Sequence, residues 1–161
     1  MTPRQLKKLN RELEKFVEFL TTDMGRPERR KAMGQYVTGL LLDGKRKCIV
    51  PMATRMADDE SDVQGLRQRL QRCVKSTWND EDLYARLARK LARELPGAEA
   101  FVVDDTGFPK KGKSSVGVGR QYSGTLGRTD NCQVAVSLHL AGERGSGCVG
   151  MRLYLPESWA S

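Results

Sequence analysis

Residues 101–113 have the sequence Phe-Val-Val-Asp-Asp-Thr-Gly-Phe-Pro-Lys-Lys-Gly-Lys, and they indicate the fold more clearly than any other part of the chain. β-Branched and aromatic side chains before the aspartates are typical of a buried strand, expected here over residues 100–103. Thr-Gly-Phe-Pro should then turn the chain, which places Asp104 and Asp105 at the strand's tip. Two adjacent carboxylates repel each other unless they face solvent, a cation or a helix N-terminus.

Three lysines follow this carboxylate pair, at Lys110, Lys111 and Lys113. Carboxylate oxygens hold Mg²⁺, and ammonium groups hold a nucleic-acid backbone. The stretch therefore predicts a site for metal-dependent phosphodiester chemistry. The alternative is a polar Asp-Asp turn followed by a solvated lysine cluster, and these residues alone leave both interpretations open.

Further motifs follow in order, and with them residues 100–159 resemble the DDE-superfamily transposases of bacterial insertion sequences. The motifs are Asp104-Asp105-Thr106-Gly107-Phe108-Pro109-Lys110-Lys111-Gly112, Ser115-Val116-Gly117-Val118, Arg120-Gln121-Tyr122-Ser123-Gly124-Thr125, Asn131-Cys132-Gln133-Val134-Ala135-Val136 and Leu153-Tyr154-Leu155-Pro156-Glu157-Ser158-Trp159. The resemblance implies an RNase H-like catalytic domain in which two Asp and one Glu bind Mg²⁺ or Mn²⁺. It also implies cleavage of transposon ends and strand transfer into target DNA. The first catalytic acid and metal ligand would be Asp105, the residue before Thr, with Asp104 as the second candidate ligand.

The sequence departs from that family in the acids that follow Asp105. Asp130, Glu143 and Glu157 lie in turn-like or terminal contexts, and none matches the family's second Asp or its Glu, which lie beyond Ser161. We therefore expect a truncated, N-terminal portion of a transposase, and its enzymatic activity alone is uncertain. The expected partner is double-stranded DNA at transposon ends, with a full-length transposase or a separately encoded C-terminal part as further partners. The alternative is a non-catalytic DNA-binding or regulatory protein derived from a transposase.

Composition is consistent with a DNA-binding protein of one or two small domains. The 161 residues are 39% hydrophobic and 30% charged, with a net charge of +8. Residues 1–98 hold 21 Lys and Arg against 14 Asp and Glu, which leaves +1 for residues 99–161. Such an excess favours a polyanionic partner. The phosphate contacts expected in the second region are Lys110, Lys111, Lys113 and Arg120.

Other classes of protein and cofactor find little support in the sequence. No apolar run approaches the roughly 20 residues of a membrane span, and the N-terminus lacks a signal-peptide core. We expect a cytoplasmic, nucleoid-associated bacterial protein. The cysteines are widely spaced and His139 is the single histidine, so no zinc site is expected. Gly117-Val118-Gly119 lacks the strand-turn-helix setting of a dinucleotide motif, so no nucleotide cofactor is expected.

Apolar residues at three- and four-residue spacing predict helices over residues 6–20, 27–44, 61–75 and 79–95. A further helix over residues 45–56 should be interrupted at Pro51. Ser61 and Asn79 are the expected caps of the last two helices. The 61–75 helix carries Arg67, Arg69 and Arg72 beside three glutamines. It is therefore the candidate base-reading helix of a helix-turn-helix-like domain, and the alternative is a solvated helix face.

Strand-like runs follow the helices, over residues 100–105, 116–122, 132–140 and 148–155, with glycine-rich turns between them. Pro96-Gly97 is the expected domain break. The predicted fold class is α+β: a basic, helical, DNA-binding domain over residues 1–98, followed over residues 99–161 by the first strands of an RNase H-like endonuclease domain.

Overall fold

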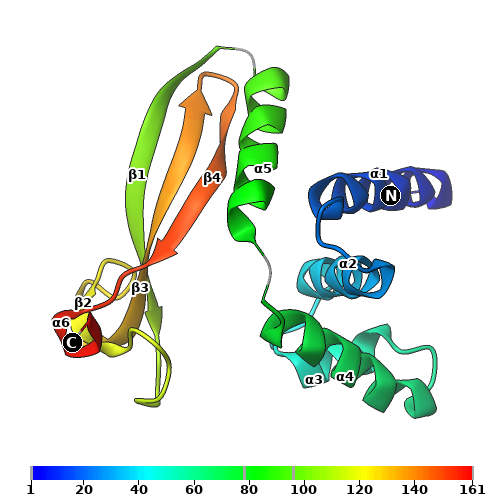
Figure 1. Ribbon diagram of the computed structural model, residues 1–161, viewed down its shortest axis with the longest axis horizontal. Coiled ribbons are helices and arrows are strands. Elements are labelled where there is room, and N and C mark those ends of the chain that lie inside the picture. The colour runs from blue at the N-terminus through cyan, green and yellow to red at the C-terminus, as the bar shows by residue number, and fades with distance from the viewer. Residues whose placement is uncertain (1, 78, 96, 161) are drawn as a thin grey trace. The chain divides into compact units, whose positions relative to one another are not determined.

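The computed structural model describes residues 2–77, 79–95 and 97–160, and it confirms the α+β class. The described residues form six helices and four strands. They divide into two compact units, Met1–Leu83 and Tyr84–Ser161, and each unit is described by itself below. Figure 1 shows the helices of the first unit and the sheet of the second. None of the helices in the described part of the chain is long and apolar enough to cross a membrane.

The first unit contains four helices, α1 (Pro3–Thr21), α2 (Pro27–Leu41), α3 (Ile49–Met56) and α4 (Glu60–Lys75). A capping box fixes the start of α1: the Gln5 backbone N–H donates to Thr2 Oγ1 at 3.3 Å, and the Thr2 N–H donates to Gln5 Oε1 at 2.7 Å. Pro27 begins α2. Proline suits this position because the first N–H groups of a helix have no acceptor within the helix, so the N–H that proline lacks costs no hydrogen bond.

The core of this unit lies between α3 and α4. Met52 and Ala53 of α3 pack with Leu66 and Leu70 of α4, and all four are buried. Gly39 brings α2 close to this core, since a Cβ at that position would lie 3.1 Å from the Met52 sulfur. Burying each large apolar side chain contributes about 1.5–3 kcal/mol, so α3 and α4 stabilise each other chiefly through these contacts.

Two details predicted for these helices are wrong. Pro51 does not interrupt α3, because the helix begins at Ile49 and Pro51 therefore lies in its first turn, where proline is tolerated. The cap of α4 is Asp59 rather than Ser61. Asp59 Oδ1 accepts the Ser61 hydroxyl at 2.5 Å and the N–H groups of Ser61 and Asp62 at 2.8 and 3.2 Å. These bonds, led by the Ser61 hydroxyl, hold the pKa of Asp59 below its ordinary value.

The second unit is built around β3 (Arg128–Gly142), the longest strand. β1 (Ala98–Pro109) pairs antiparallel with β3 from Cys132 to Gly142, β2 (Gly119–Ser123) pairs with its first residues, and β4 (Gly145–Leu153) pairs with its second half. All three other strands therefore pair with β3. A short helix, α6 (Glu157–Ala160), ends the described chain.

Helix α5 (Asp80–Glu94) begins as the sequence predicts and packs on β4. Asn79 Oδ1 accepts the Glu81 N–H at 2.9 Å. A Cβ at Gly147 of β4 would lie 2.6 Å from a Leu91 methyl carbon, so glycine at this position allows the helix to approach the strand. Figure 1 shows α5 alongside β4.

The boundary between the two units lies between Leu83 and Tyr84, whereas the sequence predicts it between residues 98 and 99, so the net charge of each part differs from the prediction. Pro96, on which that boundary partly rested, lies outside the described residues. Residues 1–83 hold 17 Lys and Arg against 13 Asp and Glu, and residues 84–161 hold 11 against 7. Each unit therefore carries +4, because the basic residues of α5 after Leu83 belong with the sheet.

Strand β1 differs from its prediction in length and in burial. It continues past the two aspartates in unbroken register, from Asp105 opposite Val136 to Pro109 opposite Cys132, so Thr-Gly-Phe-Pro is not a turn. Gly107 makes this possible, because a Cβ there would meet Ser123 Oγ of β2 at 2.4 Å. Phe101 and Val103 are each 68% exposed. The expected burial fails because none of the described elements covers these side chains of β1.

Candidate functional site

Asp104 and Asp105 lie side by side in β1, opposite Ser137 and Val136 of β3. Both aspartates are exposed. The Asp105 N–H donates to Asp104 Oδ1 at 2.9 Å, and the Ser137 hydroxyl donates to the Asp104 carbonyl oxygen at 3.3 Å. Successive side chains of a strand leave opposite faces of the sheet. One bound cation would therefore meet one of these two carboxylates rather than both.

The described residues do not by themselves fit a complete site for a divalent metal ion. Mg²⁺ prefers six oxygen ligands in near-octahedral geometry, and proteins usually hold it through one or two carboxylates together with waters and substrate phosphates. Within residues 2–77, 79–95 and 97–160 there is no group of three His, Cys, Asp or Glu side chains that could hold a metal ion. Any metal bound at Asp105 would need further ligands from elsewhere.

Three further acids of the second unit, Asp130, Glu143 and Glu157, lie at other places in the fold than Asp105. Asp130 lies in β3 rather than in the expected turn, because the β2–β3 connection is already complete at Gly127. Its carboxylate accepts the Asn131 N–H at 2.8 Å and the Arg128 guanidinium at 2.9 Å, and these bonds, the first above all, lower the pKa of Asp130. Glu143 lies between β3 and β4, and Glu157 begins α6.

The lysines after β1 lie in a loop that β3 holds by its backbone. Asn131 Nδ2 donates to the carbonyl oxygens of Lys110 and Gly112 at 2.7 and 3.0 Å, and the Lys110 N–H donates to the Asn131 carbonyl at 2.9 Å. Lys110, Lys111 and Lys113 are all exposed. The loop thus has a fixed backbone with its ammonium groups in solvent, as phosphate contacts require.

Arg120 joins this cationic surface from the other side of β3. It pairs with Asn131 in the β2–β3 ladder, and Asn131 also binds Lys110. The positive charge of Arg120 helps to lower the pKa of Asp130, and the Asp130 carboxylate in turn offsets part of the positive charge of Arg120. At about 3.3 Å per strand residue, Asp105 lies roughly 16 Å from Lys110 along β1, a length of about five base steps of a DNA strand.

The three arginines of α4 do not share one face. Leu66, Leu70 and Cys73 face the core. At 100° per residue, Gln68 and Arg72 lie opposite that buried face, and Arg67 and Arg69 lie on its two flanks. The 3.6-residue period of a helix predicts this separation of the three arginines from the sequence alone.

Hydrogen bonds within α4 hold two of these arginines. Arg72 Nη2 donates to Gln68 Oε1 at 3.3 Å, and Arg67 Nε donates to Gln64 Oε1 at 2.9 Å. The Arg69 guanidinium instead lies over Gly65, where an added Cβ would be 3.4 Å from its Nη1. The outward surface of α4, opposite the buried residues, therefore consists of Ser61, Gln64, Gln68, Arg72 and Lys75, which are all exposed.

The cysteines and the histidine have no arrangement that suggests chemistry. Burial raises the pKa of the Cys73 thiol, and nearby Arg29 partly opposes that shift. Cys132 is buried, with its thiol 3.6 Å from the Gln121 carbonyl oxygen. His139 Nε2 lies 3.2 Å from the Ser137 hydroxyl, as expected of a structural histidine.

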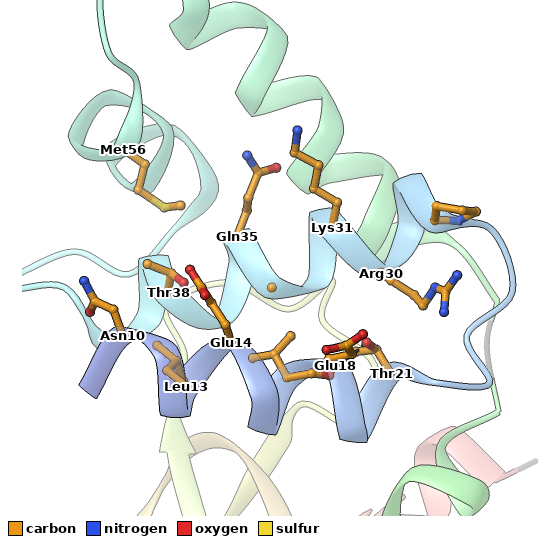
Figure 2. Close-up of a pocket in the computed structure, with 13 residues that line it drawn as sticks. Asn10, Leu13, Glu14, Glu18, Thr21, Arg30, Lys31, Gln35, Thr38 and Met56 are labelled. Carbon is orange, nitrogen blue, oxygen red and sulfur yellow. Dashed lines mark hydrogen bonds between the residues drawn. The ribbon is translucent and has the colours of Figure 1, made fainter. Parts of the chain in front are cut away.

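A groove of about 670 Å³ between α1 and α2 was not expected from the sequence. Figure 2 shows Glu14 and Glu18 of α1 on one side and Arg30 of α2 on the other. Gln35 Oε1 is buried there and has no hydrogen-bond partner among the described residues. The carboxylates of this groove come from α1 and its cations, Arg30 and Lys31, come from α2. Its lining residues do not form a pair of a nucleophile and a general base.

Comparisons with known proteins agree with the motifs around Asp105. The sequence profile of the family described as DDE superfamily endonuclease matches residues 19–161. A protein described as a probable transposase for insertion sequence element IS701, from Microchaete diplosiphon, is 35% identical over 102 residues. That match covers 63% of this chain and 26% of the relative, so the chain spans about a quarter of the length of this curated relative. No solved structure matches the chain. Because the family profile covers most of the sequence, the chain belongs to the DDE superfamily of endonucleases and resembles an insertion-sequence transposase.

Proposed function

We propose that the protein binds duplex DNA at the ends of an insertion sequence and that α4 is its base-reading helix. The supporting observation is the joining of α3 to α4 by a connection of residues 57–59, with the two helices packed through a common apolar core. Two helices joined by a three- or four-residue turn form the supersecondary unit that helix-turn-helix proteins place in the major groove.

The outward surface of α4 has the side chains that such a role requires. Gln64 and Gln68 can form paired hydrogen bonds with adenine, and Arg72 can do so with guanine. In the free protein Arg72 is bonded to Gln68, which limits its freedom before DNA is bound. Binding would exchange that single hydrogen bond for contacts with a base edge.

In the second unit, Lys110, Lys111, Lys113 and Arg120 are the proposed phosphate contacts. Their shared connection to Asn131 fixes the loop backbone, and their cationic groups are exposed. Phosphate contacts set the position of a protein on DNA and bring a strong dependence on salt, without reading the sequence. DNA binding of this kind would also keep the protein on the bacterial nucleoid.

Asp105 is the proposed catalytic residue and a ligand of Mg²⁺ or Mn²⁺, with Asp104 as the alternative ligand. The family profile and the Asp-Thr-Gly motif support this assignment. The described residues provide no group of three ligands, so this proposal requires further ligands from outside them. When bound, the metal would provide the Lewis acid of DNA cleavage, as in the family.

The exposed edge of β1 is the proposed surface for a partner polypeptide that supplies such ligands. Phe101 and Val103 are exposed beside Asp105, and β1 presents unpaired backbone groups along its outer edge among the described strands. An added strand would cover this edge and complete an RNase H-like sheet. A full-length transposase or a separately encoded C-terminal part are the candidates. A non-catalytic DNA-binding or regulatory protein derived from a transposase is the second candidate function.

Fluorescence anisotropy with a duplex from DNA flanking the gene tests the proposal for α4. Replacing Arg72 by alanine should weaken binding to the cognate duplex by about 1–3 kcal/mol, or roughly 5- to 150-fold, with a smaller effect on random DNA. Arg144→Ala, at an exposed arginine between β3 and β4, is the matched control and should bind as the unaltered protein does. Equal affinities for Arg72→Ala and Arg144→Ala would remove α4 from the interface.

The salt dependence of the same titration tests the lysine loop. Each phosphate contact contributes about 0.9 to the slope of log K against log salt concentration, so the combined Lys110→Ala, Lys111→Ala and Lys113→Ala variant should lose about 2.7 from that slope. An unchanged slope would mean that the loop does not touch the backbone.

A further inference from the structure

The loop between α2 and α3, residues 42–48, carries three consecutive cations. These cations are all exposed, and they are Lys45, Arg46 and Lys47. Asp43 is the single acid of this α2–α3 loop, which leaves it a net charge of +2. The sequence predicts a helix over residues 45–56, but α3 begins at Ile49, so the three cations lie in a loop and not on a helix. Neither the base-reading surface of α4 nor the lysine loop of the second unit includes them.

Arg55 of α3 holds the backbone of the α2–α3 loop in place. Its Nη2 donates to the Arg46 carbonyl oxygen at 3.0 Å. Its guanidinium also lies over Gly44, whose φ of +146° is a conformation that favours glycine. Arg55 follows Ile49 by six residues, or about 9 Å along the helix axis. The loop therefore folds back along one side of α3 instead of extending away from its first turn.

Two of the cations are free to bind a ligand. The Lys47 ammonium donates to the Leu42 carbonyl oxygen within the loop. The side chains of Lys45 and Arg46, by contrast, form no hydrogen bond or ion pair with the part of the chain that the structure describes. Arg55 adds a fourth cation, which is bonded to a carbonyl oxygen and not to a carboxylate. Like charges gathered in this way repel one another, so a polyanion that neutralises them is favoured at this loop.

We propose that the α2–α3 loop binds the phosphate backbone of the same duplex that α4 reads, through Lys45 and Arg46. The inference rests on the proposed function of α4 and adds a contact that positions this helix on the DNA. Because α3 packs on α4 through their common core, the loop along α3 keeps a fixed separation from α4. In helix-turn-helix proteins the first helix of the pair crosses the backbone while the second lies in the major groove.

The dimensions of a helix pair and of DNA favour phosphates over bases as the ligands of this loop. The axes of packed helices lie about 8–10 Å apart. The major groove is about 12 Å wide, so the sugar-phosphate strands at its edges lie about 6 Å from its centre. With α4 in the groove, α3 and the loop beside it come over one of these strands and not over the base edges. Lysine and arginine can bind phosphate oxygens there without reading the sequence.

The salt dependence of DNA binding by the full chain measures this contact, with fluorescence anisotropy of the duplex that flanks the gene. Two phosphate contacts contribute about 1.8 to the slope of log K against log salt concentration, so a double variant with Lys45→Gln and Arg46→Gln should lose about 1.8 from that slope. Its affinity should therefore fall about 12-fold less than that of the unaltered protein between about 50 and 200 mM salt. The loss should be equal on cognate and random DNA, whereas Arg72→Ala should affect cognate DNA more.

A second double variant, with Lys7→Gln and Lys8→Gln, is the matched control. These two lysines are exposed neighbours in α1, and their replacement changes the net charge by the same amount. The control should keep the slope of the unaltered protein, and circular dichroism should show unchanged helix content in both double variants. An equal loss of slope in the two double variants would overturn the inference, because the effect would then come from net charge alone.

Neutral phosphate analogues identify the DNA backbone as the ligand of the loop. A methylphosphonate removes the charge of one phosphate, and a scan of single substitutions along both strands should find positions that weaken binding of the unaltered protein but not of the Lys45 and Arg46 double variant. Binding by the unaltered protein together with an unchanged slope in that variant would overturn this inference and leave the function of α4 intact. A duplex that the unaltered protein does not bind at low salt would overturn the proposed function itself.

Discussion

Replacing Gly107 by alanine tests the course of β1 beyond the two aspartates. An added Cβ would lie 2.4 Å from Ser123 Oγ, 2.8 Å from Ser123 Cβ and 3.1 Å from Ser123 Cα. Carbon atoms in contact normally stay about 3.5–4.0 Å apart, so Gly107→Ala forces β1 and β2 to separate or Ser123 to move. Ser123 is fully buried, which leaves its side chain little room to move.

The expected cost is that of inserting a methyl group into a packed interior, about 1–3 kcal/mol. At about 0.05–0.15 kcal/mol per residue, a unit the size of Tyr84–Ser161 has a free energy of unfolding of about 4–12 kcal/mol. The substitution should therefore remove a substantial part of the stability of the sheet. Gly107 does not adopt a positive φ, so the cost arises from the contact with Ser123 and not from backbone strain.

Urea unfolding followed by the fluorescence of Trp159 measures this cost, with Trp78 replaced by phenylalanine in every variant so that the signal reports the sheet unit. Ser123→Gly in the Gly107→Ala background removes the two shortest contacts and should recover about 1–2 kcal/mol, less the cost of glycine in a strand. Gly112→Ala is the matched control, since nothing lies within 4 Å of its added Cβ. Unchanged stability of Gly107→Ala, or no recovery in the double variant, would refute the continuous course of β1.

Three further outcomes follow from the packing and the charges. Leu70→Ala should destabilise the helical unit by about 2–5 kcal/mol in urea unfolding, because Leu70 is fully buried between α3 and α4, and a loss below 1 kcal/mol would contradict that core. The pKa of Asp59 is lowered from 3.8 in the folded protein, so the stability that its carboxylate contributes is present above about pH 4 and is lost as the pH falls through the folded pKa. Asp59→Asn should therefore lose less stability on acidification than the unaltered protein. An identical acid profile for the two proteins would argue against the cap. A thiol reagent should modify exposed Cys48 first and should reach Cys73 and Cys132 after unfolding, which mass spectrometry of digested protein can follow, and early labelling of Cys73 would contradict its burial and raised pKa.

The helices were predicted from the sequence because their signals are local. The repeat from Leu6 to Leu20 gave α1, and Asn79 caps α5 as its side-chain chemistry suggests. The errors also have local explanations: Asp59 accepts the Ser61 and Asp62 N–H groups, so the helix begins before Ser61, and Pro51 is tolerated in a first turn. Both errors could have been avoided from the sequence, by considering Asp59 as a cap and Pro51 as a residue of a first turn.

The exposure of β1 could not be predicted in this way. Phe101 and Val103 have the composition of a buried strand, but burial depends on what covers the strand, and no such covering element can be read from neighbouring residues. The length of β1 depended on Ser123, which is distant in sequence from Gly107 and meets it only in the folded sheet. For the site, the motif predicts Asp105 as a metal ligand, and this stays a prediction, whereas the role of Asn131 in holding the lysine loop required the structure.

We propose that the protein binds insertion-sequence DNA and that its described residues supply one carboxylate, Asp105, of a metal site that needs further ligands. A labelled duplex from the DNA that flanks the gene, incubated with the purified protein and Mn²⁺ and divided between a native and a denaturing gel, measures both parts. We expect the DNA to be retarded but not cleaved. Cleavage products that disappear with Asp105→Asn and persist with Asp104→Asn would show that the chain completes its own site, and an unretarded duplex at low salt would contradict DNA binding.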